Sequence, residues 1–90
     1  MGADLTENNA FDAYARTSGW HYDNGGRYRE EYWEWYIRDS GAGTVLLRQA
    51  SGKVRVVRFE GVESRELWSG VIRTSEEFDQ MLAAIARLTQ

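Results

Sequence analysis

Residues 27–38 read RYREEYWEWYIR, and this stretch decides the fold class. Tyr, Trp and Ile favour strands, and the run is too aromatic for an exposed helix. Because side chains in a strand alternate between the two faces of a sheet, the stretch divides into two rows. One row is apolar, is expected to enter the core, and consists of Trp33, Trp35 and Ile37. The other row is amphipathic, is expected to meet solvent, and consists of Tyr32, Glu34, Tyr36 and Arg38.

Turn-forming residues place further strands on both sides of this run. Asn24-Gly25 favours a two-residue hairpin turn, because both central residues of that turn need positive φ. We therefore predict that Asn24-Gly25 joins a strand at residues 20–23 to the aromatic strand. Apolar runs separated by glycine-containing turns predict three more strands, at residues 44–49, 53–60 and 67–72, with Gly70 as a candidate bulge.

A helix is predicted near the C-terminal end of the sequence. Thr74 and Glu77 have the spacing of a capping box, in which each side chain satisfies a backbone N–H at the start of a helix. The apolar residues that follow recur at spacings of three and four, and they are Phe78, Leu82, Ile85 and Leu88. We predict a helix over residues 75–88 whose first three apolar side chains pack against the Trp33 row of the sheet.

The chain has room for one domain. Ninety residues fall just below the usual domain size of roughly 100–150 residues, so we assign residues 1–90 to a single domain. Residues 1–9 form a polar lead-in, and a short helix is expected over residues 10–16 with Asn9 as its cap. The predicted fold class is α+β: a small antiparallel meander of four to five strands with a C-terminal helix packed on one face.

The composition excludes several kinds of chemistry. Without cysteine, the protein cannot hold a disulfide, a zinc–thiolate site, an iron–sulfur cluster or a cysteine nucleophile. His21 is the only histidine, and no phosphate-binding glycine motif occurs. We therefore expect no enzymatic activity, no metal and no cofactor. The sequence has no run of about 18 apolar residues and no apolar segment after Met1, so we expect no membrane association and a cytoplasmic location.

Positive charge is concentrated in the middle of the chain. Residues 27–58 carry seven Lys and Arg against four Asp and Glu, whereas the whole chain has a net charge of −3. In the structural interpretation, the Arg stems cover apolar sheet surface. In the functional interpretation, the cations line a binding face. The candidate binding residues are large side chains expected on an exposed sheet face, and they are Tyr32, Tyr36, Arg38, Lys53 and Arg55.

These residue types favour a non-enzymatic protein-binding module or inhibitor, because Tyr, Trp and Arg dominate protein interfaces. The alternative is a single-stranded nucleic-acid-binding protein that stacks bases on the Tyr and Arg face, although Glu30 and Glu34 would repel phosphates. The outline is similar to that of the single-strand-binding transcriptional coactivators. In general character, the small acidic chain is similar to bacterial immunity proteins and to phage-encoded inhibitors of host defence. The expected partner is another protein whose identity the sequence does not give, and self-association is a further option.

Overall fold

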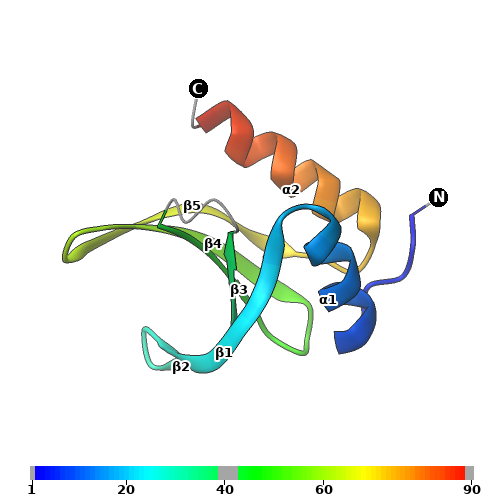
Figure 1. Ribbon diagram of the computed structural model, residues 1–90, viewed down its shortest axis with the longest axis horizontal. Coiled ribbons are helices and arrows are strands. Elements are labelled where there is room, and N and C mark those ends of the chain that lie inside the picture. The colour runs from blue at the N-terminus through cyan, green and yellow to red at the C-terminus, as the bar shows by residue number, and fades with distance from the viewer. Residues whose placement is uncertain (1, 39–42, 89–90) are drawn as a thin grey trace.

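The computed structural model describes residues 2–38 and 43–88, and it confirms the predicted α+β fold (Figure 1). In these residues five strands form one antiparallel sheet in the order β1-β2-β3-β4-β5. Each strand pairs with its neighbour in sequence, so the sheet is a meander. The elements are α1 (Asn8–Thr17), β1 (Trp20–Tyr28), β2 (Glu31–Arg38), β3 (Thr44–Arg48), β4 (Lys53–Glu60), β5 (Glu63–Val71) and α2 (Ser75–Leu88).

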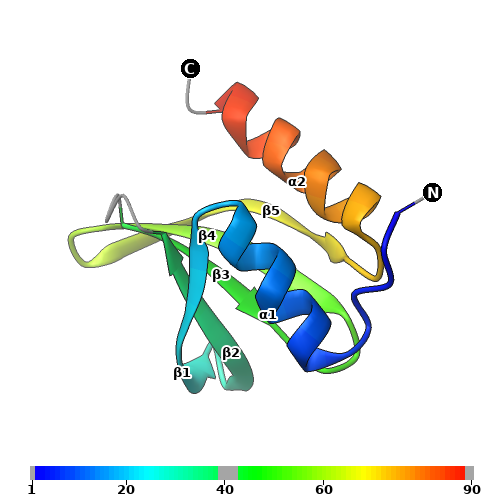
Figure 2. The same ribbon diagram turned by 45° about the vertical axis from the view of Figure 1, so that its right-hand side comes forward.

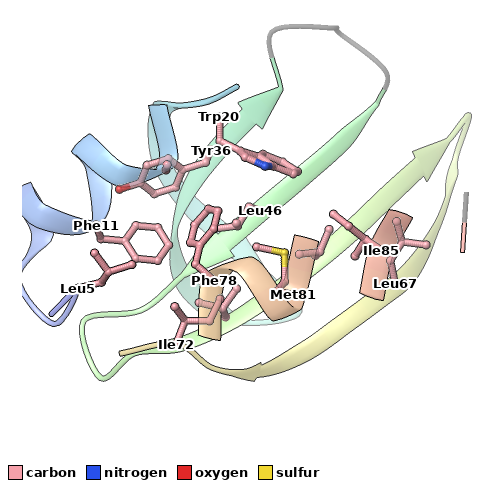
Figure 3. Packing of buried hydrophobic residues seen from close by; sticks show 13 residues of the cluster. Leu5, Phe11, Trp20, Tyr36, Leu46, Leu67, Ile72, Phe78, Met81 and Ile85 are labelled. Carbon is pink, nitrogen blue, oxygen red and sulfur yellow. The ribbon is translucent and has the colours of Figure 1, made fainter. Parts of the chain in front are cut away.

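Both helices cover the same face of the sheet (Figure 2). The Phe11 ring on α1 meets the Phe78 ring on α2 edge-on, with the centroids 5.5 Å apart. Phe11 also contacts the Tyr36 ring on β2 at 5.4 Å. Below the rings, Leu46 and Met81 are fully buried, and Figure 3 shows the cluster closed by side chains from the sheet and both helices. We call this cluster the helix-side core.

The predicted orientation of the aromatic strand was wrong. Tyr36 pairs with Leu46 and shares its face, so the Tyr-bearing row lies under the helices. The Trp33 row lies on the opposite face, and it does not pack against Phe78, Leu82 or Ile85. There it forms a second core with the buried residues Val45, Leu47 and Val57 and the partly buried residues Tyr28, Trp35 and Ile37.

The physical reason is that this sheet buries apolar groups on both faces. A prediction that assumes one buried face places the more apolar row of the strand against the helices. Here the Tyr36 ring supplies as much buried area to the helix-side core as an aliphatic side chain would, so alternation alone could not choose the face. We call the uncovered side the helix-free face and its buried cluster the helix-free core.

The first hairpin turn also lies elsewhere than predicted. Asn24 and Gly25 are inside β1, opposite Trp35 and Glu34, and the turn to β2 is made by Arg29 and Glu30 at φ 51° and 71°. The Tyr32 side chain occupies the space that a Cβ atom on Gly25 would need. The Tyr32 side chain on the neighbouring strand therefore explains why residue 25 is a glycine. The turn between β1 and β2 does not include this residue.

Two further local predictions need correction. The N-cap of α1 is Glu7, without a side-chain hydrogen bond, and not Asn9. The bulge between β4 and β5 lies at Leu67, where the pairing shifts between Val56 and Val57. Gly70 pairs regularly, and it is small because the Trp68 ring lies 2.7 Å from where its Cβ would be.

The start of α2 confirms the predicted capping box. The backbone N–H of Thr74 donates to Glu77 Oε1 (3.0 Å), and the backbone N–H of Glu77 donates to Thr74 Oγ1 (3.3 Å). The N–H of Arg73 also donates to Glu77 Oε1 (2.8 Å), and this bond lowers the pKa of Glu77. The predicted bounds of the helix, residues 75–88, agree with those of α2.

We expect Thr74→Ala to lower the free energy of unfolding by about 0.5–2 kcal/mol, because a backbone N–H of α2 loses its acceptor. Chemical denaturation measures the change. Gln80→Ala, at an exposed position on the same helix, is the control and should stay within about 0.5 kcal/mol of the parent. Equal midpoints for Thr74→Ala and the parent would show that the cap does not stabilise the helix.

Candidate binding surfaces

The structure separates the five predicted site residues onto two faces of the sheet. Tyr32, Tyr36 and Arg38 lie on the helix side, whereas Lys53 and Arg55 lie on the helix-free face. Tyr36 is only 3 % exposed, so its predicted place on an open surface was wrong. Tyr32 is 58 % exposed. The five residues therefore do not form one surface.

On the helix side, the three predicted residues have separate local contacts. The guanidinium of Arg38 lies over the Trp20 ring, 4.9 Å from its centroid. The Tyr32 hydroxyl donates to Glu34 Oε1 at 3.2 Å. Burial raises the pKa of Tyr36 to about 12. These contacts spread along β2 and do not converge on one exposed patch.

On the helix-free face, two cations cover a buried tryptophan. Lys53 Nζ and Arg55 Cζ each lie 5.6 Å from the centroid of the Trp33 ring, within the range of cation–π contacts. Each cation also has a carboxylate neighbour: Lys53 pairs with Glu31 at 3.8 Å and Arg55 with Glu66 at 3.4 Å. Trp33 is therefore sealed from water although no helix covers it.

Aromatic side chains continue this face beyond the ion pairs. The rings of Trp35 and Phe59 stack at 6.0 Å with an angle of 10° between their planes. Tyr28 meets Phe59 edge-on at 6.3 Å, and its hydroxyl lies 3.3 Å from Ser64 Oγ. Since Tyr28 ends β1 and Ser64 begins β5, opposite corners of the sheet bend toward each other over this face. Figure 1 shows the turn between β1 and β2 and the turn between β4 and β5 on one side of the molecule, away from the helices.

The candidate residues taken from the sequence did not include Trp35 and Phe59, which lie on this surface beside Tyr28. A usable signal was present, because residues 53–60 carry apolar side chains in both alternating rows. In that pattern Phe59 shares a row with Lys53 and Arg55, which indicates a sheet buried on both faces.

A basic pocket of about 420 Å³ lies beside the two cations. Arg73, from the segment between β5 and α2, joins Lys53 and Arg55 in its wall, and the hydroxyl-bearing residues Ser51 and Ser69 complete the polar lining. The turn before β4 fixes this arrangement. Gly52 adopts φ 97°, and its carbonyl accepts the Ile72 N–H at 2.9 Å, which places the Arg73 stem against the turn.

No known protein family, curated protein or solved structure matches this chain. The surface must therefore be interpreted from its own chemistry. Over residues 2–38 and 43–88, neither helix is both long and apolar enough to cross a bilayer. In the same residues, no group of three or more His, Asp or Glu side chains is arranged to hold a metal ion.

Proposed function

We propose that the protein is a non-enzymatic, cytoplasmic protein-binding module or inhibitor, and that it binds an acidic protein partner through the helix-free face. One observation carries the proposal. This face presents aromatic side chains beside a basic pocket, with Phe59 36 % exposed and Val62 fully exposed at the adjoining turn. Aromatic anchors with arginine beside them are typical of the side chains that dominate protein interfaces.

Charge complementarity supports an acidic partner. The whole chain has a net charge of −3, yet the helix-free face and its rim carry Lys53, Arg55 and Arg73 with Arg29 over the Tyr28 ring. Two chain carboxylates, Glu31 and Glu66, offset part of this charge. A locally positive patch attracts the acidic surface of a partner.

Single-stranded nucleic acid fits this surface less well. Trp35 and Phe59 stack on each other, whereas base recognition needs aromatic faces free for stacking.

The proposal can be tested with a random-peptide display library selected on the immobilised protein. We expect the enriched peptides to combine Asp or Glu with an aromatic or aliphatic side chain. Their affinity should fall at least tenfold in Arg55→Glu and in Phe59→Ser. Arg58→Glu is the matched control, because Arg58 lies on the same strand and on the opposite face, and this variant should bind like the parent.

The same titrations separate the two partner classes. Peptide binding should weaken only modestly between about 50 and 200 mM salt, because an apolar contact with a polar rim depends little on ionic screening. A labelled oligothymidine should show no micromolar affinity. Oligothymidine binding that is micromolar, falls steeply over that range, and is lost in Arg55→Glu would contradict the proposal in favour of nucleic acid. Enriched peptides without acidic residues would also contradict it.

A further inference from the structure

A second pocket, of about 300 Å³, lies on the other face of the sheet, between α1 and strands β1 to β3. Every side chain that lines it has a hydrogen-bonding group. α1 contributes Asn9 and Asp12, and the sheet contributes Tyr22, Glu34 and Tyr36. A pocket of this volume is at the small end of ligand sites, so it suits a ligand of about one ring.

Tyr36 contributes a hydroxyl group to the pocket wall. The side chain is almost wholly buried. Its ring packs edge-on against the rings of Phe11 and Tyr22, with centroid distances of 5.4 and 5.7 Å. Among the described residues, none forms a hydrogen bond with its hydroxyl. In Figure 3 this hydroxyl points toward α1 and away from Trp20. A tyrosine hydroxyl that opens into a pocket, and that no described residue bonds, is a group with which a ligand can form a hydrogen bond.

Arg48 also lines the pocket, but its guanidinium already donates hydrogen bonds to the chain. The side chain is 1 % exposed, and its Nη1 donates to Asn8 Oδ1 at 2.6 Å. Its Nη2 donates to the carbonyls of Thr6 (3.1 Å) and Leu5 (3.5 Å), and its Cζ lies 4.5 Å from the Phe11 centroid. Both terminal nitrogens already donate to the chain, and the Nε–H, which has no partner among the described residues, is buried away from the surface. Arg48 is therefore poorly placed to give a carboxylate or phosphate the usual two-pronged contact.

The charges around the pocket balance. Asp12 pairs with Arg16 at 3.2 Å on the α1 wall. Glu34 stands opposite Arg48 in the register of β2 and β3. Two acids and two cations leave no net charge for an ionic ligand to neutralise, so the pocket favours an uncharged ligand.

The remaining polar groups suit hydroxyls. The Glu34 carboxylate accepts a hydrogen bond from the Tyr32 hydroxyl. A hydrogen bond between Glu34 and Tyr22 raises the pKa of Tyr22. A carboxylate has about four acceptor positions, so Glu34 can receive further hydroxyl donors. The Tyr22 ring is 44 % exposed and offers an apolar surface beside these groups.

We infer that this pocket binds a small uncharged polyhydroxylated ligand, the size of a single sugar ring. Ligand hydroxyls donate to Glu34 and exchange hydrogen bonds with the Tyr36 hydroxyl, while the C–H face of the ring lies on Tyr22. This ligand site is independent of the helix-free face.

The test is a ¹⁵N-labelled NMR titration with glucose, galactose, mannose and N-acetylglucosamine. We expect at least one sugar to cause saturable shifts in the amides around Asp12, Tyr22 and Tyr36. Tyr36→Phe, which keeps the ring and removes only the hydroxyl, should weaken that binding about fivefold or more. Tyr14→Phe is the matched control, because the Tyr14 hydroxyl donates to Asp79 on α2, outside the pocket, and its affinity should equal that of the parent.

Glucuronate and glucosamine, titrated in the same way, test the charge argument. Each should bind more weakly than the best neutral sugar. The inference is overturned by an absence of saturable shifts with all four neutral sugars, by tighter binding of a charged analogue, or by a folded Tyr36→Phe variant with unchanged affinity. A thermal melt of each variant confirms that it is folded before its titration is interpreted.

Discussion

Trp33→Ala should lower the free energy of unfolding by about 3–5 kcal/mol, the usual cost of truncating a large buried aromatic side chain. Trp33 is fully buried, and it packs among Val45, Leu47 and Val57 in the helix-free core. Its indole N–H donates to the Tyr28 carbonyl at 3.3 Å, so the truncation also removes a hydrogen bond. The loss is large because both helices of the described residues lie on the other face, so neither can close over the cavity.

Urea denaturation monitored by far-UV circular dichroism measures this loss. Val62→Ala is the control at a fully exposed apolar position in the turn between β4 and β5, and it should change stability by less than about 0.5 kcal/mol. If Trp33→Ala unfolded within about 1 kcal/mol of the parent, the helix-free core would not contribute to stability as its burial implies.

Arg48→Ala is expected to cost about 2–4 kcal/mol, because buried backbone acceptors lose a charged donor. The carbonyls of Leu5 and Thr6 and the Asn8 amide oxygen all accept hydrogen bonds from this guanidinium. The alkyl stem and the contact with the Phe11 ring are lost as well. Arg48 thus holds the N-terminal segment and the start of α1 onto the sheet.

A second variant separates packing from hydrogen bonding. Arg48→Met restores most of the volume and leaves the acceptors unpaired, so its stability should fall between those of Arg48→Ala and the parent. Arg16→Ala is the control at an exposed arginine on α1. Stability of Arg48→Met equal to the parent's would show that the hydrogen bonds add nothing, and the tie proposed for Arg48 would then be wrong.

Features set by local chemistry could be predicted from the sequence. The start of α2 depends on Thr74 and Glu77, which lie within one turn of each other, and its apolar stripe has a helical period. The turn at Gly52 likewise depends on neighbouring residues. Such signals need no knowledge of the rest of the fold.

Features set by distant residues could not be predicted. Asn24-Gly25 has the composition of a turn, but Gly25 lies inside β1 and leaves room for the Tyr32 side chain of β2. Which face of the sheet Trp33 occupies depends on the apolar side chains of all five strands. The alternation within one strand carries no information about the other four.

The candidate site divides in the same way. Lys53 and Arg55 share a strand row, so their common face follows from alternation. Tyr32 and Tyr36 were grouped with them on the assumption that β2 has one solvated row, and that assumption failed when Tyr36 proved buried. The pocket beside Tyr36 joins α1 to the sheet, a contact that no local pattern indicates.

The two cores differ in how much of the chain each one needs. The buried residues of the helix-free core all come from β2, β3 and β4, three consecutive strands. The helix-side core draws on residues from Leu5 to Ile85, so its assembly closes loops that span nearly the whole chain. Loop-closure entropy rises with the length of the segment closed. A chain emerging from the ribosome therefore has a complete set of helix-free core residues before any residue of α2 has been added.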